Sequence, residues 1–244
     1  MEGLGVTSVH GTISTGVSDN NYWSGKRIFV TGHTGFKGGW LVAWLQYCGA
    51  IVKGYALPPD TDPNLYSALN ISSLCQSTFG DVRDKSKLFS EISEFSPEIV
   101  FHLAAQPLVR RSYDQPFETF ETNVMGTINL LESCRQQSEL HTILVITTDK
   151  VYQNNELLMP YREDAPLGGH DPYSASKAAT EMVVQSWKKS YFDPENRIRV
   201  ATARAGNIIG GGDWSVDRLI PDCIRAIQTS SCLTIRSPRA IRPW

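Results

Sequence analysis

The sequence lacks the features of disulfide-rich, zinc-binding and membrane proteins. Its five cysteines are odd in number and scattered, without a C-x-x-C pair, which argues against a disulfide framework or a zinc site. The most apolar run, residues 40–52, is too short to cross a bilayer. No Lys or Arg precedes Lys26, and no apolar segment lies near the N-terminus. We therefore expect neither a secretory signal nor a transit peptide, and we predict a cytoplasmic protein.

A strong charge bias is also missing. The formal net charge of -2 gives no reason to expect nucleic acid or an anionic membrane as a partner. With 244 residues, 41% of them hydrophobic and 20% charged, the chain favours one large globular α/β domain over two small ones. Residues 1–20 are rich in Gly, Ser and Thr, and we predict that they form a disordered extension.

Short apolar segments alternate with segments of helical spacing along the chain. The predicted strands are residues 27–31, 50–56, 76–82, 98–103, 142–147 and 199–204, and the predicted helices are about 36–48, 84–94, 115–137 and 172–190. Trp40 and Trp44 fall on the expected core face of the first helix. This alternation predicts right-handed βαβ crossovers, and hence a doubly wound parallel sheet with helices on both faces. Ligands bind such sheets at the carboxyl ends of the strands.

A glycine-rich turn, "VTGHTGFKGGW", follows the first predicted strand. Its glycines, Gly32, Gly35 and Gly38, are placed where backbone N–H groups at a helix N-terminus could approach a pyrophosphate. Such turns also occur without a ligand, but the position after the first strand favours a dinucleotide site. We favour NAD over NADP and leave the ribose contact unassigned. Asp60 and Asp62 follow the second strand too late, and no arginine lies there to bind a 2′-phosphate.

The segment "DPYSASKAATE" places Tyr173 and Lys177 four residues apart, on one face of a predicted helix. A nearby ammonium stabilises a phenolate, so this pair predicts a tyrosine base with a lowered pKa. Asp171 is the expected N-cap of that helix. A second Y-x-x-x-K pattern, residues 22–26, runs into a strand and is not expected to share a face. His33 and His102 are interpreted as packing histidines.

The glycine turn, "HLAAQP", "TTDKVY" and "YSASK" together resemble the extended short-chain dehydrogenase/reductase family, over about residue 22 to the end. Longer matches such as "FHLAAQPLVRRSY", "ARAGNIIGGGDW", "DRLIPDCIRA" and "AIRPW" resemble the nucleotide-sugar dehydratases of that family. The resemblance implies a Rossmann-type NAD-binding domain over residues 21–204. It also implies the start of a smaller substrate lobe over residues 205–244, and we expect the chain to end before that lobe is complete. Poor activity or stability of the chain by itself would follow from an incomplete lobe.

The resemblance also implies catalytic roles. Tyr173 would be the base, Thr148 would orient the sugar hydroxyl, and Lys177 would also bind the nicotinamide ribose. Dehydratases place an acid and a base directly after the Ser/Thr, and Asp149 followed by Lys150 agrees with the cytidine-diphosphate type. The implied reaction is a carbon–oxygen lyase reaction on CDP-glucose or a related nucleotide sugar. It consists of oxidation at C4, loss of water across C5 and C6, and reduction at C6 to a 4-keto-6-deoxy sugar.

The remaining contacts implied by the turn and the resemblance are with cofactor and substrate. The cofactor-binding residues are Gly32, Thr34, Gly35, Phe36, Lys37, Gly38, Asp81, Val82, Leu103, Ala104 and Ala105, together with Tyr173 and Lys177. Substrate contacts beside Thr148 are Asn207 and Arg242, the arginine being suited to a diphosphate. No metal site is expected. A homodimer through helices 115–137 and 172–190 is expected by resemblance only.

Two questions stay open from the sequence. An ordinary lysine is protonated at neutral pH, so Lys150 could be the C5 base, could polarise the ketone, or could pair with Asp149. The function itself has two alternatives. One is another nucleotide-sugar epimerase or dehydratase, against which the Asp149–Lys150 pair argues. The other is a non-catalytic NAD-binding fragment, against which the set of Thr148, Tyr173 and Lys177 argues.

Overall fold

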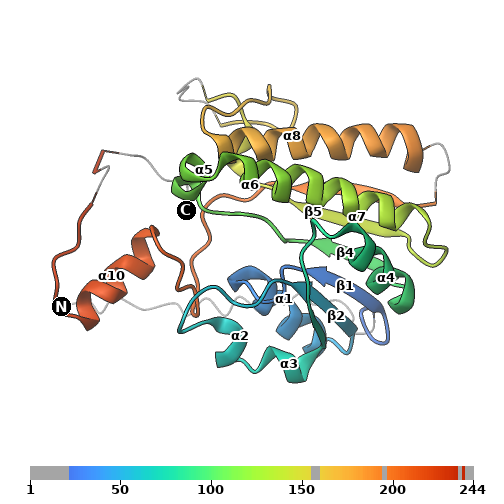
Figure 1. The fold of residues 1–244 in the computed structure, drawn as a ribbon, viewed down its shortest axis with the longest axis horizontal. Helices are drawn as coiled ribbons and strands as arrows, with labels where there is room; N and C mark the ends of the chain where they lie inside the picture. Colours follow the sequence, from blue (N-terminus) through green and yellow to red (C-terminus); the bar gives the residue numbers. More distant parts are fainter. Residues whose placement is uncertain (1–21, 155–159, 194–196, 236–237, 240–244) are drawn as a thin grey trace, which may run out of the picture.

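A six-stranded parallel sheet forms the centre of the protein, with the strand order β3-β2-β1-β4-β5-β6 (Figure 1). The computed structural model describes residues 22–154, 160–193, 197–235 and 238–239. The strands are β1 (Arg27–Thr31), β2 (Ile51–Ala56), β3 (Gln76–Phe79), β4 (Ile99–His102), β5 (Thr142–Ile146) and β6 (Arg199–Ala203). All six predicted strands are confirmed, and so is the Rossmann-type doubly wound fold. The extension predicted for residues 1–20 lies outside the described residues.

Helices cover both faces of the sheet, as Figure 1 shows. The helices are α1 (Phe36–Tyr47), α2 (Leu65–Ala68), α3 (Ile71–Leu74), α4 (Lys85–Phe95), α5 (Val109–Asp114), α6 (Pro116–Phe120), α7 (Gly126–Arg135), α8 (Pro172–Trp187) and α10 (Leu219–Gln228). Of these, α10 lies away from the sheet, at the left of Figure 1. The long helix predicted over 115–137 is α6 and α7 joined by a π-helical turn, Glu121–Met125. A second π-helical turn, Lys188–Phe192, extends α8. Short α2, α3 and α5, and helix α10, were not predicted.

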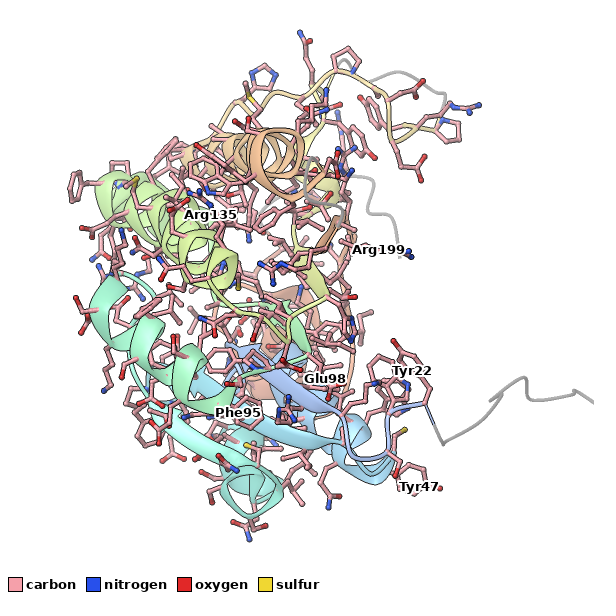
Figure 2. All side chains as sticks on the ribbon, turned by 90° about the vertical axis from the view of Figure 1, so that its right-hand side faces the viewer. Tyr22, Tyr47, Phe95, Glu98, Arg135 and Arg199 are labelled. Atoms are coloured by element: carbon pink, nitrogen blue, oxygen red, sulfur yellow. The ribbon has the colours of Figure 1, made fainter. Side chains whose placement is uncertain are left out.

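Alternate residues of the strands pack into two separate apolar layers. Phe29 and Val100 belong to the core that α4, α7 and α8 cover, whereas their neighbours Ile28 and Ile99 belong to the core under α1 and α3. This alternation follows from the two-residue period of a strand. Figure 2 shows Phe95 on the α4 side and Tyr22 on the opposite side of the sheet.

Trp40 and Trp44 are not core residues, which corrects the prediction from helical spacing. The side chains that α1 buries are those of Val42 and Leu45, whereas both tryptophans are 47% exposed. Trp44 packs edge-on against Trp23, with ring centroids 5.5 Å apart. Trp40 donates its indole N–H to the carbonyl of Gly211 at 2.9 Å. Both lie at the margin of the helix layer, where spacing alone does not reveal which face meets the sheet.

The strand order reverses between β1 and β4, and this arrangement places the ligand site. Chain connections leave β1 toward β2 and β3, and leave β4 toward β5 and β6. The loops after β1 and β4 therefore diverge and leave a crevice at the carboxyl ends of these strands. The glycine turn follows β1, and residues 103–105 follow β4. Both predicted cofactor segments are thus brought to one crevice, although about seventy residues separate them in the sequence.

Candidate active site

The glycine turn forms a cradle in which side chains would collide with backbone. A Cβ atom on Gly38 would lie 2.0 Å from the carbonyl oxygen of Gly32. Gly32 has a φ of +77°, and a Cβ there would lie 2.8 Å from the amide nitrogen of Ala104. Gly35 is the N-cap of the twelve-residue α1, which has no side-chain cap and no acidic residue in its first turn. The first amides of α1 are therefore available to an anion such as a pyrophosphate.

Thr31 joins the turn to the loop after β4. Its hydroxyl oxygen accepts the backbone N–H groups of Leu103 and Ala104, both at 3.1 Å. The same hydroxyl is 2.7 Å from Nδ1 of buried His102, whose Nε2 lies 3.1 Å from the Thr127 hydroxyl. Burial and, to a smaller extent, the charge of Lys177 lower the pKa of His102 to about 3, so the ring is neutral. His102 is thus a hydrogen-bonded core residue that shapes the crevice wall, in line with the packing interpretation.

His33 is also buried. Its Nε2 lies 2.7 Å from the hydroxyl of Ser77, and the ring packs on Gly54, where a Cβ would be 2.4 Å away. Burial lowers the pKa of His33 to about 4, against a smaller opposing effect of the Tyr55 carbonyl. Thr34 in the same turn donates its hydroxyl to the carbonyl of Leu57. The turn is therefore fastened to the end of β2, where the adenosine half of a dinucleotide is bound in such folds.

β3 ends at Phe79, so Asp81 and Val82, predicted inside the strand 76–82, lie in the turn that follows it, and the Asp81 carboxylate has an internal partner. Arg83 donates its backbone N–H and its guanidinium to Asp81, with a shortest contact of 2.5 Å, and it also pairs with Glu121. Burial opposes ionisation of Asp81, but the bonds from Arg83 dominate and hold its pKa below the usual range. An adenine contact by Asp81 would be shared with Arg83, a residue that the sequence motifs do not assign.

The end of β5 faces α8, and this contact assembles the predicted catalytic residues. Asp171 caps α8 as predicted, accepting the N–H of Ser174 at 2.9 Å. Tyr173, in the first turn, shares a hydrogen bond with Thr148, and Lys177 donates to the carbonyl of Ile146 at 3.2 Å. Tyr173, Lys177 and Thr148 are all buried. The other pair, residues 22–26, lies just before β1, and Lys26 is bonded to Glu98 there.

The pKa values of Tyr173 and Lys177 differ from the expectation in one respect. Burial and, to a smaller extent, the charge of Lys37 lower the pKa of Lys177 to about 7, with Glu181 opposing both effects. Burial raises the pKa of Tyr173 above its usual value, although the Thr148 hydrogen bond and Arg218 act in the opposite direction. The predicted lowering of the tyrosine pKa is therefore not observed, because desolvation outweighs the effects of Thr148 and Arg218.

Asp149 and Lys150 lie in a single 3-10 turn, Asp149–Val151, that the hydroxyl of Thr148 caps. Thr148 also donates this hydroxyl to the Asp149 carboxylate at 3.1 Å. The backbone N–H of Asp149 donates to the carbonyl of Ala205, so the turn is bonded to the segment after β6. Alcohol, carboxylate and amine are thus presented together, next to Tyr173. A sugar beside Thr148 would meet the Thr148 hydroxyl, the Asp149 carboxyl group and the amines of Lys150 and Lys177.

Of the two further substrate residues, Asn207 is exposed in the loop after β6, and Arg242 lies outside the described residues. Arg218 is a cation that the motif analysis does not assign. The charge of Arg218 lowers the pKa of Tyr173. The pKa of Lys37 is lowered by burial of its amine and by Arg218, although Lys37 as a whole residue is exposed. Asp213, with a side chain only 6% exposed, holds Arg218 at 3.0 Å. The "DRLIPD" motif, already part of the resemblance, was the available signal for Arg218.

An apolar groove of about 430 Å³ lies elsewhere, toward the amino ends of β4, β5 and β6, between Trp23, Trp44 and Phe101. It is separate from the crevice described above. Within the described ranges, no three His, Cys, Asp or Glu side chains form a group that could hold a metal ion. No helix in the same ranges is long and apolar enough to cross a membrane.

The fold and the site define a class: a Rossmann-type protein with a dinucleotide cradle and a Tyr–Lys pair facing a strand-end alcohol. The chain belongs to the NAD dependent epimerase/dehydratase family, whose sequence profile matches residues 28–244. This is the family that the motifs predicted, and it confirms NAD as the class of cofactor. Two curated relatives lie in the same family. CDP-glucose 4,6-dehydratase of Salmonella typhimurium is 53% identical over 93% of this chain and 64% of that protein. UDP-glucose 4-epimerase of Mycolicibacterium smegmatis is 35% identical over 68% of this chain and 52% of its own length.

Solved structures agree. A dTDP-glucose 4,6-dehydratase from Streptomyces venezuelae, a double mutant with NAD bound, superimposes with a TM-score of 0.74 and 25% identity, over 85% of this chain and 63% of that one. UDP-glucose 4-epimerase from Thermus thermophilus, in complex with NAD, has a TM-score of 0.68 and 29% identity, over 78% of this chain and 58% of that one. The chain thus spans less than two thirds of the length of these relatives.

Proposed function

We propose that the protein is an NAD-dependent dehydratase that converts CDP-glucose to its 4-keto-6-deoxy product. The observation that carries the proposal is the Thr148–Asp149–Lys150 end of β5 facing Tyr173 and Lys177. The similarity to the Salmonella CDP-glucose 4,6-dehydratase supports it. Epimerisation at C4 needs no acid for a departing C6 hydroxyl, so the Asp149–Lys150 turn argues for dehydration. A cytoplasmic location is part of the same proposal.

Bound NAD would supply the hydride chemistry of the reaction, as acceptor of a hydride from C4 of the sugar and as its donor to C6. The residues that would hold it are Gly32, Gly35 and Gly38 with the free amides of α1, because a side chain at Gly32 or Gly38 would collide with backbone atoms of that cradle. Lys177, buried beside the crevice, would bind the nicotinamide ribose. A pyrophosphate at the α1 N-terminus and a ribose at Lys177 would place the nicotinamide near Thr148 and Tyr173.

The side chains then divide the proton transfers. Tyr173 takes the proton of the C4 hydroxyl in its phenolate form, which burial disfavours and which the Thr148 hydrogen bond and Arg218 stabilise. Thr148 orients the same sugar hydroxyl. The C4 ketone acidifies the hydrogen on C5, which a base removes. Asp149, in its protonated form, donates a proton to the C6 hydroxyl as it departs as water, and Lys150, in its neutral form, is the candidate C5 base. Arg218, Lys37 and Lys177 are cations around this site and suit a diphosphate substrate.

The test is an assay of the complete gene product with NAD and CDP-glucose, and with UDP-, dTDP- and GDP-glucose in parallel. We expect CDP-glucose alone to be turned over efficiently, giving a product lighter by one water molecule in mass spectrometry. Release of a C4 epimer of unchanged mass would show an epimerase. NAD binding without conversion of any of these sugars would show a non-catalytic protein. Either result would overturn the proposal.

Lys150→Met is expected to retain NAD binding and to lower the rate of dehydration by about 10²-fold or more, because a general base contributes on this scale. Product formation and NAD affinity are measured on the same preparation. Lys189→Met, an exposed lysine on the turn after α8, is the matched control and should change neither. A normal rate for Lys150→Met would show that dehydration needs neither proton transfer by Lys150 nor its charge.

We also propose a homodimer formed through α6, α7 and α8. Apolar side chains on these helices and on the π-helical turn between α6 and α7 are exposed in the single chain, among them Phe117 at 79%, Met125 and Met182. Burying such side chains against a second copy would remove apolar area from water. Light scattering is expected to give twice the monomer mass, and Phe117→Asp should reduce it to that of the monomer. A monomeric unmodified protein at micromolar concentration would contradict this proposal.

A further inference from the structure

Three residues of α8 contact three consecutive residues at the end of β5. Tyr173, Lys177 and Glu181 follow one another at four-residue intervals and so lie on one face of the helix. Tyr173 shares a hydrogen bond with Thr148, and Lys177 donates to the carbonyl of Ile146. The Glu181 carboxylate accepts the hydroxyl of Thr147, the residue between them. The first two of these contacts belong to the proposed chemistry; the third has no part in it.

Glu181 is a buried carboxylate whose acceptor positions are filled by the protein. Its side chain is 5% exposed. Besides Thr147, it accepts the hydroxyl of Thr202 at 2.8 Å and two guanidinium N–H groups of Arg204 at 3.1 Å each. These donors come from the end of β5 and from β6, so a single carboxylate joins two strands to α8. Charge-assisted bonds of this kind are short-range and directional, which suits a fixed geometry.

Arg204 extends the connection to the segment that follows the Asp149–Val151 turn. Its guanidinium carbon lies 4.9 Å from the ring centroid of Tyr152, the residue directly after that turn. Another of its N–H groups donates to the carbonyl of Glu163 at 3.0 Å. Tyr152 in turn stacks on Tyr161, with ring centroids 5.1 Å apart and planes 9° from parallel. The Glu181–Arg204 pair therefore touches both sides of the catalytic strand end: α8 and the loop beyond Lys150.

We propose that Glu181 is a positioning residue that holds Tyr173 and Lys177 in register with the Thr148–Lys150 strand end. It reaches no substrate atom itself; it acts through Thr147 and Arg204. Its catalytic consequence rests on the function proposed above, whereas its effect on Lys177 does not. The charged and titratable groups around Lys177 are Lys37 from α1, His102 from β4, and Tyr173 and Glu181 on its own helix, with Arg218 facing Lys37. Glu181 is the anion of this set, and it opposes the lowering of the Lys177 pKa.

The test compares Glu181→Gln with the unmodified protein. The titration of Lys177 is followed by NMR of carbon-labelled lysine, with the signal assigned by its loss in Lys177→Met. We expect the midpoint to fall below the value of the unmodified protein, because Gln removes the anion that stabilises the ammonium. We expect kcat on CDP-glucose to fall by about 10- to 100-fold, as for a misplacement of about 1 Å. KM and the affinity for NAD should stay within about threefold, since the contacts to both ligands are kept.

Glu181→Asp separates position from charge, and it also serves if Glu181→Gln does not fold. It keeps the anion but withdraws it by one methylene, so kcat should fall while the Lys177 midpoint stays near that of the unmodified protein. The matched control is Glu132→Gln on α7, which breaks another Glu–Arg pair and a 2.6 Å bond from Trp187 at the far end of α8. It should lower stability without changing the Lys177 midpoint or kcat.

Two results would overturn the inference. One is a Glu181→Gln variant in which both the Lys177 titration midpoint and kcat are unchanged. If only Glu181→Asp folds, an unchanged kcat in that variant has the same meaning. The other is an equal effect of Glu132→Gln on both readouts, which would show a general loss of structure. A failure of the proposed function has a different signature. The unmodified protein would then not convert CDP-glucose, while the Lys177 titration of the Glu181 variants would still decide whether Glu181 acts on the pair.

Discussion

Lys177→Met is expected to abolish turnover and to stabilise the fold near neutral pH. The ammonium binds the nicotinamide ribose and sits beside Tyr173 in the proposed mechanism, so its loss should lower kcat by about 10²- to 10⁴-fold, the scale of an acid–base group. Stability changes in the opposite direction. Burial lowers the Lys177 pKa from 10.5 to about 7, so the folded protein holds this proton less readily than the unfolded chain. The buried lysine is therefore a net cost to folding at neutral pH.

The pH dependence of that cost follows from the two pKa values. Below about pH 7 both states are protonated, and the cost, on the order of a few kcal/mol, is fully present. Between pH 7 and 10.5 the folded state has released the proton and the unfolded state has not, so the cost declines as the pH rises. The gain in melting temperature from Lys177→Met should thus be largest at and below pH 7 and shrink toward pH 10. Lys189→Met should show no such trend, and a pH-independent gain would contradict the assigned pKa.

Gly38→Ala is expected to remove NAD binding, with an affinity loss of about 10²-fold or more, as for a catalytic group displaced by about 1 Å. The added Cβ would lie 2.0 Å from the Gly32 carbonyl oxygen and 2.8 Å from the His33 Cα. These are backbone atoms, so only a shift of the whole turn relieves the overlap, and the amides that would hold the pyrophosphate shift with it. Overpacking of this kind should also cost about 1–3 kcal/mol of unfolding free energy.

Calorimetric titration with NAD and urea unfolding measure the two effects of Gly38→Ala. The matched control is Gly211→Ala, because a Cβ at Gly211 meets no atom within 4 Å. That variant should bind NAD as the unmodified protein does and unfold at a similar urea concentration. NAD binding by Gly38→Ala at normal affinity would show that the glycine turn is not the phosphate cradle.

The strands and the main helices were predictable because their signals are local. Apolar runs of about five residues mark β1 and β4. The Asp171–Pro172 pair marks the start of α8, because Asp171 caps the helix by accepting an N–H three residues further on. The glycine turn was predictable for the same reason, since its spacing reflects a backbone constraint within one turn. The short helices were missed because four to six residues show too little periodicity to be recognised.

The exposure of Trp40 and Trp44 could not be predicted, because helical spacing shows which residues share a face but not which face meets the sheet. The same limit applies to the pKa of Tyr173. The Tyr–Lys spacing predicts a lowered value, whereas burial under the assembled fold raises it. Both the exposure of the tryptophans and the pKa of Tyr173 depend on which side chains other segments of the chain bury, and that is set by tertiary packing.

By itself the sequence determined the α/β class, the glycine cradle, the residues at the end of β5 and the Tyr173–Lys177 face of α8. Each of these depends on backbone geometry within a few neighbouring residues. Only the tertiary structure decided which of them meet, Thr148 with Tyr173 and Glu181 with Thr147 and Arg204. It also decided that the charge of Arg218 acts on Lys37 and Tyr173. Those contacts join segments tens of residues apart. They exist because a parallel sheet with right-handed crossovers brings the carboxyl ends of its strands to one edge. Burial at that edge then shifts the pKa values of Tyr173 and Lys177.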